Sequence, residues 1–392
     1  MKPEVKKVAF VLVLCCGIAL RIWLSTLGWN YDVLCWVIYG AMVEEGQNLY
    51  VDTSIGYNYG PIWAGIAWLI LRFRQALGFT GMTSFHVLVA GFLSIVDVGI
   101  AMTLARAWGY IPAVLFFLCP VSILITGFHS QIDNIAILLA LWSWRALDAQ
   151  PEGSAQPDDV IWPGVLLGLS LATKHVFAFF PLWVLALRSR PVRQRLAYAG
   201  IAYAVFLGSF IPYILTSEGF AGAKNTVFLY RGEIHFGNAL LPRLIPDQAL
   251  WAGAFEAGML AVGFIIARWA PREVFFLYPV ALVTFATTMA DQYLAIPLIS
   301  FAAYWKHLPM WAYILAATTA LLGSKNNVGS LGAMQFIAAP LRATGFTLSP
   351  DAHSTLFPQI FLLVFLLSWP IAASIRHRVT RPSSSADGPE VI

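Results

Sequence analysis

The chain has 392 residues, of which 59% are hydrophobic and 11% are charged, and its formal net charge is +4 at pH 7. A soluble protein of this length carries about a quarter charged residues, so this composition excludes a soluble globular enzyme or binding module. The basic residues are scattered at the ends of apolar segments and form no stripe, which excludes a nucleic-acid partner. Long apolar runs without alternating strands predict an all-α, polytopic transmembrane helix bundle of about 11–13 membrane segments rather than a barrel.

The first apolar run covers 8–27 and follows Lys2, Lys6 and Lys7. It is longer than the apolar core of a signal peptide, and no small-residue cleavage site follows it. We therefore expect a retained first span with a cytoplasmic N-terminus. The four cysteines have no spacing typical of metal ligands.

Further apolar segments follow along the chain, and several are shorter than the roughly 20 residues of a bilayer span. They cover 59–76, 83–104, 111–127, 131–147, 161–173, 175–187, 196–216, 250–268, 273–289, 292–305, 308–323 and 359–376. We expect a single transmembrane domain over 1–376. Its outer loops are predicted at 28–58, 217–249 and 324–358, and a disordered cytoplasmic tail at 377–392.

Basic loops predict which ends of the segments face the cytoplasm. The strongest is "RSRPVRQR" at 188–195, and Arg268 and Arg272 mark another. With those loops inside, the polar breaks and the outer loops gather on the opposite face, and both termini are cytoplasmic.

Between residues 59 and 127, the basic residues predict a topology that is not self-consistent. Arg72 and Arg74 predict one cytoplasmic loop and Arg106 predicts another, yet only one segment lies between them. Either a segment is partial or one arginine cluster is outside. We expect a kink or a short helix at 111–127, which contains two prolines.

The first outer loop carries the best placed acid. Asp32 follows the first span directly, near the membrane surface, where a carboxylate is suited to act as a base. Glu44 and Glu45 are typical of the end of a short surface helix. Tyr57 and Tyr59, in "YNYGP", precede the next apolar segment, where tyrosines are commonly interface anchors.

The stretch "FHSQIDNI" at 128–135 carries His129, Gln131 and Asp133 between two apolar runs. A charge inside a span indicates function, whereas a polar turn at the interface needs none. Ordinary turns favour Gly, Pro, Asn and Ser, so this pattern favours a functional turn.

Lys174 and His175 stand within the otherwise uncharged segment 161–187. In one long span the lysine lies near the middle of the membrane, and in two short helices the pair lies at the outer rim. Either arrangement suits a phosphate partner. A lysine that extends its amine to the interface is the structural alternative.

Two further stretches carry candidate ligands. Loop 217–249 contains "YRGEIH", in which Arg231 is suited to bidentate phosphate binding or simply neutralises Glu233, beside His235. "ADQYLAIP" has Gln292 and Tyr293 at a break between apolar runs; its Asp291 has a structural alternative as a helix N-cap.

In this order, the features resemble the GT-C superfamily of integral-membrane glycosyltransferases that take sugars from polyprenyl-phosphate donors. The pattern is closest to bacterial polyprenol-phosphate-mannose-dependent mannosyltransferases. The matching elements are Asp32 after the first span, "YNYGP", "HSQID", Lys174 followed by an apolar run and Pro181, and "QYLAIP". Here "YGP" stands for the family's Tyr-Pro-Pro, His-Ser-Gln stands for Gly-Gln, and no Asp-x-Asp pair follows the first span.

The resemblance implies inverting transfer of a hexose, mannose first and glucose next, on the extracytoplasmic face of a bacterial cytoplasmic membrane. It implies that Asp32 deprotonates the acceptor hydroxyl and that Lys174, Arg231 and His175 bind the donor phosphate. Sugar or acceptor contacts are expected from His129, Gln131, Asp133, Tyr57, Tyr59, Glu233, His235, Gln292 and Tyr293. The expected partners are the polyprenyl-phosphate sugar, membrane lipids, and a glycolipid, glycan or protein acceptor, with no cofactor or metal.

Two other interpretations stay open. In a secondary transporter or lipid flippase, Lys174, Asp97 and Asp291 are the ion or substrate sites, although no internal repeat is visible. Asp97 is equally a structural acid paired with His86 or Arg106. A non-catalytic subunit of a membrane enzyme would keep the fold and lose the base.

Overall fold

The computed structural model describes residues 3–51, 56–150, 157–229, 239–324 and 355–379. Within these ranges the protein is all-α: it has seventeen α-helices, several short 3₁₀ or π turns labelled η, and no strand. The all-α prediction is therefore confirmed for the described residues.

The first half of the chain forms α1 (Pro3–Thr26), α2 (Tyr31–Glu44), α3 (Ile62–Ala76), α4 (Met82–Trp108), α5 (Tyr110–Phe117), α6 (Pro120–Leu124), η1 (Ile125–His129), α7 (Asp133–Asp148), η2 (Pro157–Val160), α8 (Ile161–Thr173), η3 (His175–Phe177) and α9 (Phe180–Leu185). The second half forms α10 (Val192–Gly208), η4 (Ile211–Tyr213), α11 (Ser217–Ala223), η5 (Lys224–Phe228), α12 (Leu240–Leu244), η7 (Gln248–Leu250), α13 (Trp251–Trp269), η8 (Pro271–Glu273), α14 (Val274–Phe285), η9 (Asp291–Ala295), α15 (Leu298–Tyr304), α16 (Leu308–Gly323) and α18 (Leu356–Val379).

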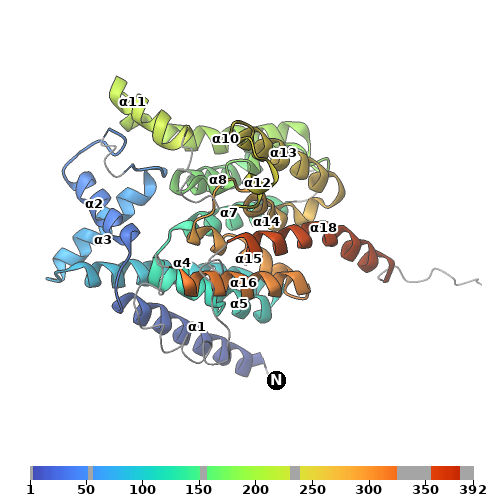
Figure 1. Cartoon of the computed structure of the whole chain (residues 1–392), viewed down its shortest axis with the longest axis horizontal. Helices are drawn as coiled ribbons and strands as arrows, with labels where there is room; N and C mark the ends of the chain where they lie inside the picture. Colours follow the sequence, from blue (N-terminus) through green and yellow to red (C-terminus); the bar gives the residue numbers. More distant parts are fainter. Residues whose placement is uncertain (1–2, 52–55, 151–156, 230–238, 325–354, 380–392) are drawn as a thin grey trace, which may run out of the picture.

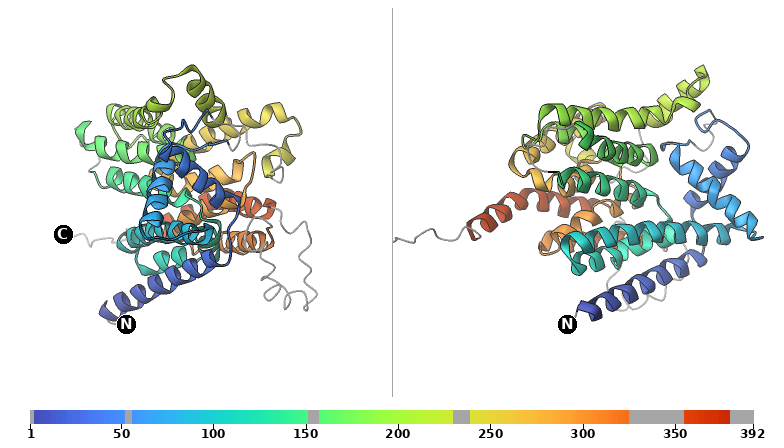
Figure 2. Two further views of the ribbon diagram at one scale, coloured as in Figure 1. Left: turned by 90° about the vertical axis from the view of Figure 1, so that its left-hand side faces the viewer. Right: turned by 180° about the vertical axis from the view of Figure 1, so that it is seen from behind.

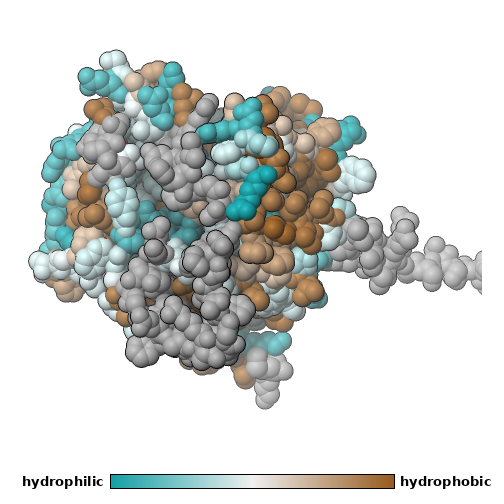
Figure 3. Space-filling view, in the orientation of Figure 1, coloured by the Kyte–Doolittle hydropathy of each residue, from teal (hydrophilic) through white to brown (hydrophobic). Residues whose placement is uncertain are grey.

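Several helices are long and apolar enough to cross a membrane, which indicates an integral membrane protein. Among the described residues there are four, namely Glu4–Thr26, Met82–Trp108, Val192–Tyr213 and Gln248–Trp269, or up to six if each of two bent helix pairs is one span. The finer count of 11–13 segments stays a prediction. Apolar side chains dominate the right-hand part of the surface in Figure 3. On α13, Phe264, Ile265 and Trp269 are exposed, as expected of a lipid-facing helix.

The long helices run roughly side by side, and the two ends of the bundle differ (Figures 1 and 2). Helix α1 begins and α18 ends at one end, whereas α2 and α3 pack together at the other, where α1 ends and α4 begins. We call these the basic end and the α2–α3 end. At the basic end, Arg190 and Arg272 line one cavity together, and the guanidinium of Arg145 lies 5.4 Å from the centre of the Trp108 ring.

The position of α3 removes the conflict in the predicted topology. Helix α3 has 15 residues and lies at the α2–α3 end instead of crossing the bundle. Arg72 pairs there with Glu44, the last residue of α2, at 2.8 Å. Arg72 and Arg74 are therefore at the end of the bundle opposite Arg106. This agrees with the predicted solution in which the two arginine clusters lie on opposite sides. The kink expected at 111–127 is also confirmed, because α5 and the following helix are bent by 46°.

Candidate functional site

Helix α2 presents one face of acidic and aromatic residues to a cavity. Its N-cap is Asn30, whose Oδ1 accepts the backbone N–H of Val33 at 3.1 Å, so the helix starts just before Asp32. Residues three, four and seven positions after Asp32 share its helix face, since these spacings correspond to about one and two turns. Accordingly Asp32, Cys35, Trp36 and Tyr39 all line the same cavity of about 260 Å³.

The Asp32 carboxylate is held by two side chains that are distant in sequence. His129 Nε2 lies 2.7 Å from Asp32 Oδ2, and Gln131 Nε2 donates to the same oxygen at 2.5 Å. The Asp32 side chain is 27% exposed, whereas His129 and Gln131 are buried. Because both contacts use Oδ2, Oδ1 is the oxygen without a partner among the described residues, and it is the one suited to accept a proton.

An unusual backbone turn brings His129 and Gln131 to Asp32. The π-helical turn η1 ends at His129, and Ser130 then adopts a left-handed conformation with φ 54°. It is the one non-glycine residue with positive φ in the described part of the chain. Its carbonyl accepts the indole N–H of Trp36 at 3.1 Å, which ties the turn to α2. Both features are enriched at functional sites, so the backbone itself marks this turn as a candidate.

Lys174 is fixed by Asp133, the first residue of α7. Its Nζ donates to Asp133 Oδ2 at 2.7 Å, and both side chains are buried. The backbone of Lys174 is extended and ends α8, and the following η3–α9 segment is bent by 117° from α8. The sequence allows one long span or two short helices over this segment. The structure has two short helices, with Lys174 and His175 at the break between them.

Two tyrosine rings lie near the lysine. Lys174 Nζ is 5.2 Å from the ring centre of Tyr59 and 6.0 Å from that of Tyr293, both within cation–π range. Burial raises the pKa of the Tyr59 phenol well above its ordinary value, so this ring stays neutral. The lysine therefore has one carboxylate partner and two aromatic neighbours.

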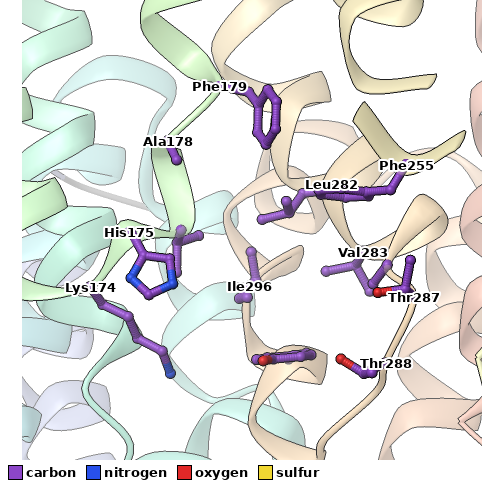
Figure 4. Close-up of a pocket in the computed structure, with 13 residues that line it drawn as sticks. Lys174, His175, Ala178, Phe179, Phe255, Leu282, Val283, Thr287, Thr288 and Ile296 are labelled. Atoms are coloured by element: carbon purple, nitrogen blue, oxygen red, sulfur yellow. The ribbon is translucent and has the colours of Figure 1, made fainter. Parts of the chain in front are cut away.

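Two cavities of different polarity meet at Lys174 and His175. The first is the α2 cavity described above, and the second has a volume of about 230 Å³. Figure 4 shows Lys174 and His175 on one side of the second cavity, Thr287 and Thr288 on the other, and apolar Phe179, Leu282 and Phe255 towards its far part. Lys174, His175, Thr288 and Tyr293 line both cavities. The pair thus lies at the boundary between a polar and an apolar space.

A third cavity, of about 340 Å³, lies on another side of Asp32. It is lined by Asp32, His129, Asp291 and Gln292 among others. Asp32 and Gln292 line both this cavity and the α2 cavity. The carboxylate of Asp32 therefore faces two spaces, of which one leads to Lys174 and one does not.

Three buried polar atoms at the site have no hydrogen-bond partner among the described residues. They are Gln131 Oε1, Asp133 Oδ1 and His175 Nδ1. Of the three residues, His175 lines the two cavities that meet at Lys174, whereas Gln131 and Asp133 are not among the lining residues of the three cavities. Buried polar atoms are nearly always paired, so the unpaired His175 Nδ1 at a cavity indicates a group that a ligand or water satisfies.

The other predicted site residues have varied positions. Gln292 and Tyr293 line the α2 cavity, as Tyr59 does. Tyr57 is buried, donates to Gly60 O at 2.7 Å and accepts the N–H of Ala64, so it fixes the start of α3; its sugar contact stays a prediction. Arg231, Glu233 and His235 lie outside the described residues, so the structure does not test those three.

Two structural alternatives from the sequence are corrected. Asp97 pairs with Arg21 at 3.2 Å and not with His86 or Arg106. Asp291 is not a helix N-cap, because Ala290 takes that position in η9 and Asp291 instead accepts a hydrogen bond from Ser324 Oγ.

Sequence reasoning missed two kinds of residue. Trp36 and Tyr39 could have been found from their helical spacing after Asp32. Arg21 could have been found as a lone charge within an apolar span, which is a functional or structural signal by itself. Phe179 and Phe255, which line the apolar cavity, carry no distinguishing sequence signal in so apolar a chain.

Among the described residues, no group of three or more His, Cys, Asp and Glu side chains has an arrangement suited to a metal ion. The chain matches no protein-family model, no curated protein and no solved structure.

Proposed function

We propose that the protein is a GT-C-like membrane glycosyltransferase. It transfers a hexose, mannose first and glucose next, from a polyprenyl-phosphate donor to an acceptor hydroxyl on the extracytoplasmic face. One observation carries the proposal: the carboxylate of Asp32 shares a cavity with Lys174 and His175, and these two also line an apolar cavity. A base, a cation and an apolar space are the three elements that transfer from a lipid-linked sugar phosphate requires.

The proposed reaction is a single displacement at the anomeric carbon. Asp32 Oδ1 takes the proton of the acceptor hydroxyl while the acceptor oxygen forms a bond to that carbon. The bond from the carbon to the phosphate oxygen breaks, and its electron pair leaves with polyprenyl phosphate. The attack comes from the face opposite the leaving group, so the configuration inverts. No covalent glycosyl-enzyme forms, since one carboxylate serves as base.

The leaving group gains negative charge. Among the residues that the structure describes at the site, Lys174 is the cation that can stabilise this charge. One of its three N–H groups donates to Asp133, which orients the ammonium and leaves two donors. The neighbouring His175 has an unpaired Nδ1 that can donate a further hydrogen bond to phosphate. In this assignment Asp133 positions Lys174, and His129 and Gln131 orient the base.

The apolar cavity suits the lipid part of the donor. Its lining includes Phe179, Phe255, Leu282 and Ile296, and it starts at Lys174. A phosphate at the lysine would direct the first isoprene units into this space and the hexose towards Asp32. The third cavity, which Asp32 also lines, then receives the acceptor.

The basic end faces the cytoplasm in this proposal. The start of α1, the end of α18 and the linkers that carry Arg190 and Arg272 are at that end, consistent with the excess of basic residues on cytoplasmic loops. The α2–α3 end is then extracytoplasmic, and α2 and α3 form the first outer loop.

The test incubates purified protein in lipid nanodiscs with polyprenyl-phosphate-mannose or polyprenyl-phosphate-glucose and a panel of acceptors. Release of free hexose is measured as well, because water can replace an unknown acceptor. We expect Asp32→Asn to lower turnover by about 10²–10⁴, the usual contribution of a general base.

Glu44→Gln is the matched control, since it removes a carboxylate from the same helix that pairs with exposed Arg72. It should retain full turnover. Equal activity of Asp32→Asn and wild type contradicts the assignment of the base. Failure of the wild type to use either donor, with or without acceptor, contradicts the proposed function itself.

A further inference from the structure

A fully buried polar network lies behind the candidate site. Arg21 Nε of α1 lies 3.2 Å from Asp97 Oδ2 of α4, and both side chains have no solvent exposure. Asp97 Oδ2 also accepts from Thr126 Oγ1 at 2.8 Å, and Asp97 Oδ1 accepts from Asn134 Nδ2 at 2.6 Å. The two oxygens of one carboxylate therefore bind residues of two different elements, η1 and α7.

Arg21 is itself held from several sides. Its Nη1 donates to Gly17 O at 3.1 Å, and its Nη2 donates to Phe117 O at 2.8 Å and Ser122 Oγ at 2.7 Å. The guanidinium also lies 4.3 Å from the centre of the Phe117 ring. The arginine thus joins α1 to the kink between α5 and α6, and its charge stays fixed beside Asp97.

The partners of Asp97 stand on both sides of the functional turn. Thr126 precedes His129 by three residues, and Asn134 directly follows Asp133. Between them the backbone packs on α1: a side-chain carbon at Gly127 would lie 2.8 Å from Arg21 Cα. The segment from 126 to 134 is therefore fixed at both ends to one buried ion pair and pressed against the helix that carries it.

We infer that the Arg21–Asp97 ion pair is a positioning unit for the site, which holds the 126–134 turn so that His129 and Gln131 contact Asp32 and Asp133 contacts Lys174. That the ion pair holds the turn follows from these contacts alone, whereas its effect on catalysis rests on the proposed function. Arg21 and Asp97 line none of the cavities that Asp32 or Lys174 lines, so they act through the turn and are not catalytic residues.

Stability alone gives a poor reason for this ion pair. Replacing a buried pair by apolar residues is often neutral or stabilising, because two charges must be taken out of water to form it. Buried polar groups are better attested as devices that fix one register among alternatives. Register matters here, because a shift of one residue in the turn would present Phe128 or Ser130 to Asp32 in place of His129.

The test separates the turn from the ion pair. Thr126→Val combined with Asn134→Leu removes both hydrogen bonds to Asp97 and leaves Arg21 and Asp97 in place. Arg21→Met combined with Asp97→Leu removes the whole charge pair without leaving an unpaired charge. At least one of these two variants is expected to fold, because neither leaves a single buried charge without its partner.

The main measurement is amide hydrogen exchange in the turn, with the protein in nanodiscs. The N–H groups of Ser130 and Gln131 both donate to Ile125 O, so their protection reports the closed turn. We expect about tenfold or faster exchange at these two amides in either variant, since local opening is sampled independently of global unfolding.

Ser143→Ala is the matched control for loosening of the bundle. Ser143 is buried on the same helix α7 and bonds to Pro163 O at 2.6 Å and to Tyr198 Oη at 2.8 Å, away from the turn. It should leave exchange at 130 and 131 unchanged. Wild-type exchange in each of the two double variants that folds, or an equal increase in the Ser143→Ala control, overturns the inference.

Kinetics with the donor then test the catalytic part. Loss of the turn should lower kcat at least about tenfold, because the base is misoriented, and should also raise the KM for the donor, because Asp133 no longer orients Lys174. Unchanged kcat together with faster exchange overturns the catalytic part. If wild type transfers no sugar, the proposed function fails, and the exchange measurement still decides the structural part.

Discussion

The Lys174–Asp133 pair gives the sharpest test of the site's energetics. Lys174→Met keeps the length of the side chain and removes its charge. Asp133 then loses its ion-pair partner, because the lysine binds Oδ2 and Oδ1 has no partner among the described residues. The substitution therefore leaves a carboxylate that is buried and has no hydrogen bond.

The expected cost follows from the loss of one member of a buried ion pair, which destabilises proteins by about 3–5 kcal/mol because the remaining charge is buried without compensation. We therefore expect Lys174→Met to lower the free energy of unfolding by about 3–5 kcal/mol.

The assay is reversible unfolding in mixed micelles of a mild detergent and sodium dodecyl sulfate, followed by circular dichroism. The double variant Lys174→Met with Asp133→Asn should recover most of the loss, since no buried charge remains. Lys306→Met is the matched control, because Lys306 is exposed, and its effect should stay within about 0.5 kcal/mol.

Two results would contradict this reasoning. A loss below about 1 kcal/mol for Lys174→Met would show that Asp133 finds water or another partner, as exposed pairs do. A double variant as unstable as the single one would show that packing by the lysine stem, and not the unpaired charge, causes the loss.

Three further predictions concern close packing and the two cavities. Gly60→Ala should lower the free energy of unfolding strongly, because the new side-chain carbon would lie 1.9 Å from Ala172 O. In the same assay, Gly65→Ala on the neighbouring helix α3 should raise the free energy of unfolding by up to about 1 kcal/mol, because its side-chain carbon meets nothing within 4 Å. Tyr59→Leu should raise the donor KM several-fold through loss of the ring beside Lys174, whereas Tyr59→Phe should not; equal effects would exclude a cation–π role. Phe255→Ser should raise the KM for a long-chain donor and leave that for a short-chain analogue unchanged, and an equal rise for both would place the lipid elsewhere.

Local sequence signals predicted the parts of this molecule that depend on neighbours in the chain. The apolar runs predicted the helical class, the two prolines predicted the bend at 111–127, and Glu44 and Glu45 were correctly taken as the end of a short helix. Lys174 was correctly recognised at a possible break, because a charge and a polar residue interrupt an apolar run there.

Pairings between distant residues could not be predicted in the same way. Asp32 and His129 are 97 residues apart, and nothing local to either indicates the other. The left-handed backbone at Ser130 is equally hidden, because serine has no preference for that conformation. The partner of Arg72 is also hidden, because Glu44, with which it forms an ion pair at 2.8 Å, lies 28 residues earlier in the chain.

The charges of the site restrict how a sugar phosphate can bind. Asp32, Asp133 and Lys174 together carry one net negative charge when both carboxylates are ionised, and a lipid-linked sugar phosphate brings one more. The charge on the phosphate increases as the bond to the sugar breaks, so the site must stabilise the product more than the donor. Lys174 is already shared with Asp133, and His175 Nδ1 beside it has no hydrogen-bond partner among the described residues. We therefore expect a second cation to assist Lys174 in the proposed reaction, and Arg231, which lies outside the described residues, is the residue that the sequence predicts for it.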